Sequence, residues 1–169
     1  TIGECLEAIG RSTHRDYEVL VIDDASTDNT AQIAAQHPCQ LVRLERNVGA
    51  AIAKNIGARE ARGDIILFTD DDILLQPNTL SLVAEDFSDP QHDGVVGLLS
   101  KDLRYQDFPT QFKNLWMHYT YTRLANASEA GQNVGVFYTS LAAIRREAFA
   151  ALGGFDERYC GASVTEDIE

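Results

Sequence analysis

The fold is decided by an apolar run that ends in acids, Ile65-Ile66-Leu67-Phe68-Thr69-Asp70-Asp71-Asp72. Its first four residues follow a Gly-Asp break, and a short continuous apolar run of this kind is typical of a buried strand. Three consecutive carboxylates repel one another unless a cation or solvent relieves the charge, whereas an ordinary turn needs only one aspartate. The stretch therefore predicts a buried strand with an acidic functional edge.

A second strand-and-acid unit lies earlier in the chain. Residues 17–22 (Tyr-Glu-Val-Leu-Val-Ile) run into Asp23-Asp24, although a plain turn explains this pair about as well. Helical patterns at 2–9, 50–61, 112–124 and 145–152, and from Pro77, alternate with extended runs at 41–44, 94–99 and 134–144. This alternation predicts an α/β fold with a mainly parallel sheet, whose carboxyl edge would bring both acid clusters together.

Composition narrows the function classes. The 169 residues fit one domain, 44% of them are hydrophobic, and the net charge of −12 argues against binding of nucleic acid or anionic lipid. The three cysteines, Cys5, Cys39 and Cys160, are far apart, which excludes zinc ribbons and disulfide scaffolds and favours reduced thiols in the cytoplasm. No stretch has the roughly 18 apolar residues of a membrane helix, so we expect membrane association only through segments outside this sequence.

Several common catalytic fingerprints are absent. The sequence contains no G-x-G-x-x-G, no Gly-Lys-Ser/Thr and no G-x-S-x-G, and its four histidines show no ligand spacing. The acid clusters offer hard oxygen ligands, which suit Mg²⁺ or Mn²⁺, and Mg²⁺ usually takes one or two carboxylates together with phosphate oxygens. We therefore expect a divalent cation that bridges protein and phosphate.

Five motifs in order carry a family resemblance: Val21–Asp28, Asn47–Gly57, Ile66–Asp72, Gly153–Glu157 and Thr165–Asp167. Together they resemble the family 2 glycosyltransferases, inverting enzymes with a three-layer α/β/α GT-A fold. The resemblance covers essentially the whole chain and departs at the ends, where the family's first strand and its C-terminal part are missing. Residues 1–169 are thus expected to form a single domain that lacks its first strand and is poorly stable alone.

The resemblance assigns donor-side roles. Asp24 matches the acid that binds the nucleotide base, usually uracil, while Asp70 and Asp72 match the D-x-D acids. In that match Asp72 lies nearer the metal and Asp70 toward the ribose. Lys54 occupies a position where the family often has a basic residue; a phosphate contact and a solvated helix face are equally good interpretations.

The resemblance also implies the reaction. Asp167 matches the general base, with Glu166 beside it near the acceptor. The implied activity is metal-assisted, inverting transfer from a nucleotide-diphosphate sugar, preferably a UDP-sugar, to a saccharide, lipid-linked or other hydroxyl acceptor. A retaining route would need a second, nucleophilic carboxylate, which the sequence does not identify. The implied location is the cytoplasm, or the cytoplasmic face of a membrane.

Three alternatives stay open at this point. A sugar nucleotidyltransferase shares similar sheets and metal chemistry, although the Thr165-Glu166-Asp167 ending speaks against it. A receiver-type module also places paired acids after one strand and another acid after a later one, but it is shorter than this chain. A catalytically silent nucleotide-binding domain would retain the fold without needing all four of Asp24, Asp70, Asp72 and Asp167.

The aromatics within 101–132, from Phe108 to Tyr121, are interpreted first as core or lid and second as a sugar-stacking surface.

Overall fold

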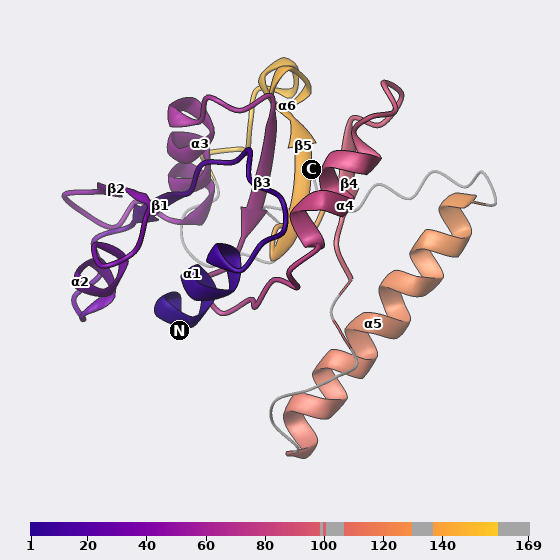
Figure 1. Ribbon diagram of the computed structural model, residues 1–169, viewed down its shortest axis with the longest axis horizontal. Coiled ribbons are helices and arrows are strands. Elements are labelled where there is room, and N and C mark those ends of the chain that lie inside the picture. Colours follow the sequence, from indigo (N-terminus) through magenta and orange to yellow (C-terminus); the bar gives the residue numbers. More distant parts are fainter. Residues whose placement is uncertain (99, 101–106, 130–136, 159–169) are drawn as a thin grey trace.

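The computed structural model describes residues 1–98, 100, 107–129 and 137–158 (Figure 1). The elements are, in chain order, α1 (Ile2–Gly10), β1 (Leu20–Asp23), α2 (Thr30–Ala34), β2 (Gln40–Arg43), α3 (Ala50–Glu60), β3 (Ile65–Thr69), α4 (Thr79–Asp86), β4 (Gly94–Val96), α5 (Phe108–Glu129), β5 (Leu141–Arg145) and α6 (Arg146–Leu152). Strands and helices alternate as the sequence predicts, so the α/β class is confirmed.

The strands form two sheets within the described residues. β1 and β2 pair in parallel, whereas the second sheet has the order β3-β5-β4 and both of its pairings are antiparallel. The expectation of a mainly parallel sheet is therefore wrong for this part of the chain. Alternation of strands and helices shows which segments are strands but not their direction, and β5 runs back along β3. Thr69 consequently lies opposite Leu141, and the start of β5 lies beside the acidic end of β3.

Two apolar clusters fix the position of β3. In the first, α1 buries Ile2, Cys5, Leu6 and Ile9 against Ala34 and Leu75. In the second, Ile66 and Phe68 of β3 pack with Ala58 of α3, Ile144 of β5 and Phe149 of α6. The Phe68 ring also meets Phe155 edge-on, with centroids 5.3 Å apart. Because these contacts immobilise β3, they fix the point from which the acid run begins.

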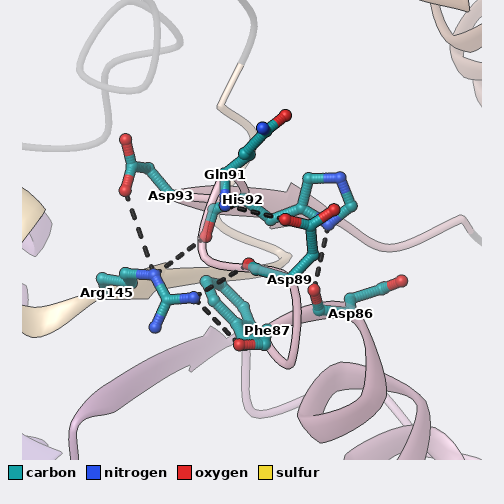
Figure 2. Close-up of polar contacts among 7 residues, drawn as sticks. All are labelled: Asp86, Phe87, Asp89, Gln91, His92, Asp93 and Arg145. Atoms are coloured by element: carbon teal, nitrogen blue, oxygen red, sulfur yellow. Dashed lines mark hydrogen bonds and ion pairs between the residues drawn. The ribbon is translucent and has the colours of Figure 1, made fainter.

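Arg145, at the end of β5, holds the loop between α4 and β4 (Figure 2). Its guanidinium donates to the carbonyls of Phe87, Asp89 and His92 at 2.9, 3.0 and 3.0 Å, and lies 5.2 Å from the centre of the Phe87 ring. The Asp93 carboxylate completes the cluster at 3.9 Å. One side chain thus ties the loop to the central strand of this sheet.

Helix α5 stands apart from the other layers in Figure 1. Phe108, Phe112, Trp116 and Tyr119 are 77, 59, 56 and 61% exposed, so the expectation that these rings belong to the core is wrong. Spacing alone shows that aromatics share a helix face but not what covers that face. A lid or a sugar-stacking surface stays a prediction. No described helix is both long and apolar enough to cross a membrane.

Candidate active site

The acid run begins where β3 ends. Asp70 is held there by Ser140, which lies opposite it one position beyond the last pair of the β3–β5 register. The Asp70 N–H donates to the Ser140 carbonyl at 3.3 Å, and the Ser140 hydroxyl donates to Asp70 Oδ2 at 2.7 Å. The Asp70 carbonyl accepts the Ile73 N–H at 3.2 Å, which bends the chain after the strand. Asp71 and Asp72 lie in this bend and are exposed, so their carboxylates can meet a ligand from solvent.

The turn after β1 gives the two acids of the Asp23-Asp24 pair different tasks. Asp23 is 2% exposed; its Oδ1 accepts the Ser26 N–H at 2.8 Å and its Oδ2 lies 3.3 Å from Nε of Arg43. Ala25, which follows the pair, has a φ of 59°, a left-handed conformation that costs a residue with a Cβ about 1–2 kcal/mol. Its N–H donates to the Asp23 carbonyl. Asp23 is therefore the structural member of the pair and stabilises a strained turn.

Asp24 connects this turn to helix α3. Its two carboxylate oxygens accept the Val48 and Gly49 N–H groups at 2.7 and 2.9 Å. These donors lie at the start of α3, where backbone N–H groups lack helical partners and the dipole favours negative charge. Gly49 adopts a φ of 91°, which a glycine tolerates. Asp24 thus anchors α3, and its role toward a nucleotide base stays a prediction.

Lys54 lies on the same helix and reaches toward β5. Its Nζ donates to Oγ1 of Thr139, the residue before Ser140, and lies 5.6 Å from the centre of the Phe155 ring. The side chain is half-buried, so the interpretation of Lys54 as part of a solvated helix face is wrong. Helix α3 therefore contacts Asp24 at its first residues and carries Lys54 in its middle. Lys54 in turn contacts Thr139, whose neighbour Ser140 contacts Asp70.

Ser140, Thr139 and Asn55 were not predicted from the sequence to be site residues. Neither Ser140 nor Thr139 lies in a motif, because their role depends on the antiparallel register that places them beside Asp70. Asn55 is 5% exposed; its side-chain amide pairs with both backbone groups of Phe155, at 2.9 Å for the N–H and 2.8 Å for the carbonyl. It also donates to the Glu157 carboxylate at 3.1 Å. The signal for Asn55 was its polarity on a helix of small residues.

The carboxylates after β3 suit a divalent cation whose remaining coordination positions are filled by the phosphate oxygens of a bound nucleotide. Within the described ranges, no group of three or more His, Cys, Asp or Glu residues could hold a metal by itself. A cage made wholly of protein side chains is not what Mg²⁺ or Mn²⁺ needs when phosphate oxygens complete the shell. Exposed carboxylates directly beyond a rigid strand satisfy that chemistry. Asp70 and Asp72 are the residues that would hold the cation.

Cys5 of α1 lies behind the acid run. Its thiol makes a weak contact with the Asp70 carbonyl at 3.8 Å. Burial raises the pKa of the Cys5 thiol, and the nearby Asp71 and Asp72 carboxylates raise it further. Because a thiol must lose its proton to act as a nucleophile or a metal ligand, Cys5 is a packing residue here. Glu166 and Asp167 lie outside the described residues.

The family follows from comparison with known proteins. Residues 1–153 match the family model for glycosyl transferase family 2. The chain belongs to this family. The family predicted from the ordered motifs is therefore confirmed, and the receiver-type interpretation is set aside.

Individual relatives in the family agree with this assignment. GlyG, a glycosyltransferase of Streptococcus pneumoniae serotype 4, is 31% identical over 99 residues, which cover 56% of this chain and 33% of GlyG. The O-antigen chain rhamnosyltransferase WbaN of Salmonella anatum is 27% identical over 162 residues, covering 91% of this chain and 50% of WbaN. The matched part of the chain thus corresponds to about a third of GlyG and half of WbaN.

A solved glycosyltransferase structure confirms the expected GT-A fold. The mannosyltransferase PcManGT of Pyrobaculum calidifontis, determined with GDP-Man and Mn²⁺, superposes with a TM-score of 0.75 at 29% identity. The match covers 99% of this chain and 45% of PcManGT.

Proposed function

We propose that this chain forms the donor-binding part of an enzyme that transfers a sugar from a nucleoside diphosphate sugar to an acceptor hydroxyl, with inversion and with the help of Mn²⁺ or Mg²⁺. The observation that carries the proposal is the connected edge at the end of β3. There Ser140 holds Asp70 while Thr139, one residue earlier, accepts from Lys54. Acids for a cation and a lysine for phosphate thus lie on one rigid frame.

On the donor side, each residue has a task that suits its place. Asp72 would hold the cation, and Asp70 would either share it or bind a ribose hydroxyl. Lys54 binds a phosphate oxygen, and Asp24 accepts from the nucleotide base at the start of α3. A bound cation supplies Lewis-acid stabilisation of the charge on the departing diphosphate. The net charge of −12 opposes a diphosphate, and a bound cation would offset that repulsion at the site.

On the acceptor side, we assign the general base to Asp167 and place Glu166 beside it near the acceptor. Asp167 takes the proton of the acceptor hydroxyl as its oxygen bonds to the anomeric carbon. The bond from that carbon to the diphosphate oxygen breaks at the same time, and the nucleoside diphosphate leaves. A single displacement of this kind inverts the anomeric configuration. Saccharides, lipid-linked groups and other hydroxyl compounds are the acceptor classes, in the cytoplasm or at the cytoplasmic face of a membrane.

Uridine is the base favoured by the family resemblance. The relative PcManGT, whose structure contains GDP-Man and Mn²⁺, makes guanosine the competitor to test. Both donors present the same diphosphate to Lys54 and the acid run, so the base affects Asp24 but not the rest of the assignment.

The proposal is tested by following nucleoside diphosphate release by the intact protein from a panel of UDP- and GDP-sugars with candidate hydroxyl acceptors. We expect release that requires Mn²⁺ or Mg²⁺ with one nucleotide preferred, and a product of inverted configuration by proton NMR. Failure to release diphosphate from any donor in the panel, or a retained configuration, would contradict the proposal.

The Asp167→Asn variant tests the general-base assignment in the same assay. Removal of a general base is expected to lower turnover by roughly 10²–10⁴-fold while donor affinity stays nearly unchanged. A parallel fall in turnover and donor affinity would instead make Asp167 a structural or metal-binding residue.

A further inference from the structure

Ser140 meets Asp70 with both its backbone and its side chain. Its carbonyl accepts the Asp70 N–H at 3.3 Å, and its hydroxyl donates to Asp70 Oδ2 at 2.7 Å. A hydroxyl hydrogen bond to a carboxylate is charge-assisted and is stronger than one between neutral groups. Within the described residues, the hydrogen bond that the structure gives for the Asp70 carboxylate is the one from Ser140 to Oδ2. Oδ1 can therefore meet a ligand.

The strand register explains why this residue is a serine at this place. The β3–β5 pairing ends with Thr69 opposite Leu141, and the Asp70–Ser140 contacts extend it by one residue. A shift of one position would bring Thr139 or Leu141 to Asp70. Leucine has no hydroxyl to donate, and the Thr139 hydroxyl would lose its contact with Lys54.

Thr139 extends the arrangement to the lysine. It is 1% exposed, and its Oγ1 accepts from Lys54 Nζ. A buried hydroxyl with a charged donor is costly to leave unpaired. Two consecutive residues of the turn before β5 therefore fix the ammonium group on α3 and the first acid after β3 relative to each other.

We propose that Ser140 is a positioning residue for the donor site. By holding Oδ2 of Asp70, its hydroxyl fixes the carboxylate so that Oδ1 alone meets the cation or the ribose of the donor. Thr139 does the same for Lys54, so the distance between the acid and the lysine is set by the turn that leads into β5 rather than by the ligand. This inference rests on the proposed function, and it adds two residues that act through others and touch no substrate themselves.

The test measures Mn²⁺-dependent binding of UDP and GDP to the intact protein by calorimetry, alongside its melting temperature. We expect Ser140→Ala to weaken nucleotide binding in Mn²⁺ by about tenfold, as loss of one hydrogen bond to a charged group implies. Ser140→Thr, which keeps the hydroxyl, is expected to restore most of the affinity. Ser88→Ala is the matched control, because the Ser88 hydroxyl donates to the exposed end of α4, at the Glu85 carbonyl.

A double-mutant cycle separates positioning from general damage. If Ser140 acts through Asp70, Ser140→Ala adds little to the loss caused by Asp70→Asn. Fully additive losses, unchanged binding in Ser140→Ala, or a failure of Ser140→Thr to restore binding would each overturn the inference. Absence of nucleotide binding by the wild-type protein in Mn²⁺ would instead contradict the proposed function itself.

Discussion

At the scale of single residues, the side-chain amide of Asn55 occupies the space that a side chain on Gly154 would need. From α3, Asn55 makes three hydrogen bonds to Phe155 and Glu157, which hold the segment after α6 against this helix. A Cβ on Gly154 would lie 2.6 Å from Oδ1 of Asn55, and Gly154 has a φ of 77°. The turn that leads toward residues 159–169 therefore requires glycine for two independent reasons, space and backbone conformation.

Substitutions at three glycines separate these reasons. Gly154→Ala is expected to lower the free energy of unfolding by about 2–4 kcal/mol, since it adds a clash to the strain of a positive φ. Gly153→Ala meets open space at a φ of 85° and should cost about 1–2 kcal/mol from strain alone. Gly10→Ala meets nothing within 4 Å and should be neutral or slightly stabilising. Denaturant titrations measure all three, and equal losses at Gly153 and Gly154 would contradict the clash.

Residue identities were predictable where a motif carried them. The helix expected at 145–152 is α6, which ends at the left-handed cap residue Gly153, and the Phe155 ring of the following motif packs on Phe149 with centroids 5.2 Å apart. The contacts of Asp70 with Ser140 and of Lys54 with Thr139 were not predicted, because they join residues 70 and 85 positions apart. Contacts over such distances depend on strand register, which composition and periodicity do not specify.

At the scale of elements, β5 carries more of the architecture than its five residues suggest. It pairs with both β3 and β4, begins beside the donor acids, and ends at Arg145. The Arg145 side chain is 20% exposed and donates to three loop carbonyls (Figure 2). A planar guanidinium presents several donors in a fixed geometry, which an ammonium cannot reproduce.

Adjacent arginines provide a test of this element. Arg145→Met is expected to lower the free energy of unfolding by about 2–3 kcal/mol, and Arg145→Lys by most of that amount. Arg146→Met is the control, because the 47% exposed Arg146 side chain makes one 3.4 Å ion pair with Asp64, and surface pairs contribute about 0–1 kcal/mol. Thermal or chemical unfolding of the three variants gives the comparison. Equal effects at both positions would mean that the loop does not depend on Arg145.

Element types were more predictable than their limits. Every predicted helix is present, whereas the predicted strand 17–22 is observed as β1, Leu20–Asp23. Tyr17 and Glu18 are taken by other contacts: the Tyr17 hydroxyl donates to the Ile9 carbonyl, and Glu18 accepts from Arg62 and Gly63. The expected extended run 134–144 yields β5 at Leu141–Arg145, and residues 130–136 of that region lie outside the described part.

At the scale of the whole molecule, the proposed function requires an acidic chain to bind an anionic donor. The net charge of −12 opposes a diphosphate, and the exposed Asp71 and Asp72 carboxylates add to this repulsion locally. In the proposed function, a divalent cation would turn the same carboxylates from a repulsive surface into a set of metal ligands. Donor binding is therefore expected to depend on the cation more than on any single contact to the nucleotide.

The most direct measurement is the affinity of the intact protein for UDP and GDP in Mn²⁺ and in EDTA, for the wild type, Asp72→Asn and Asp16→Asn. Asp16→Asn removes the same charge from an exposed position outside the site. We expect the wild type and Asp16→Asn to bind about tenfold or more tightly with Mn²⁺, and Asp72→Asn to lose most of that difference. Equal wild-type affinity in Mn²⁺ and EDTA, or an Asp72→Asn variant that keeps the full effect of Mn²⁺, would contradict the account.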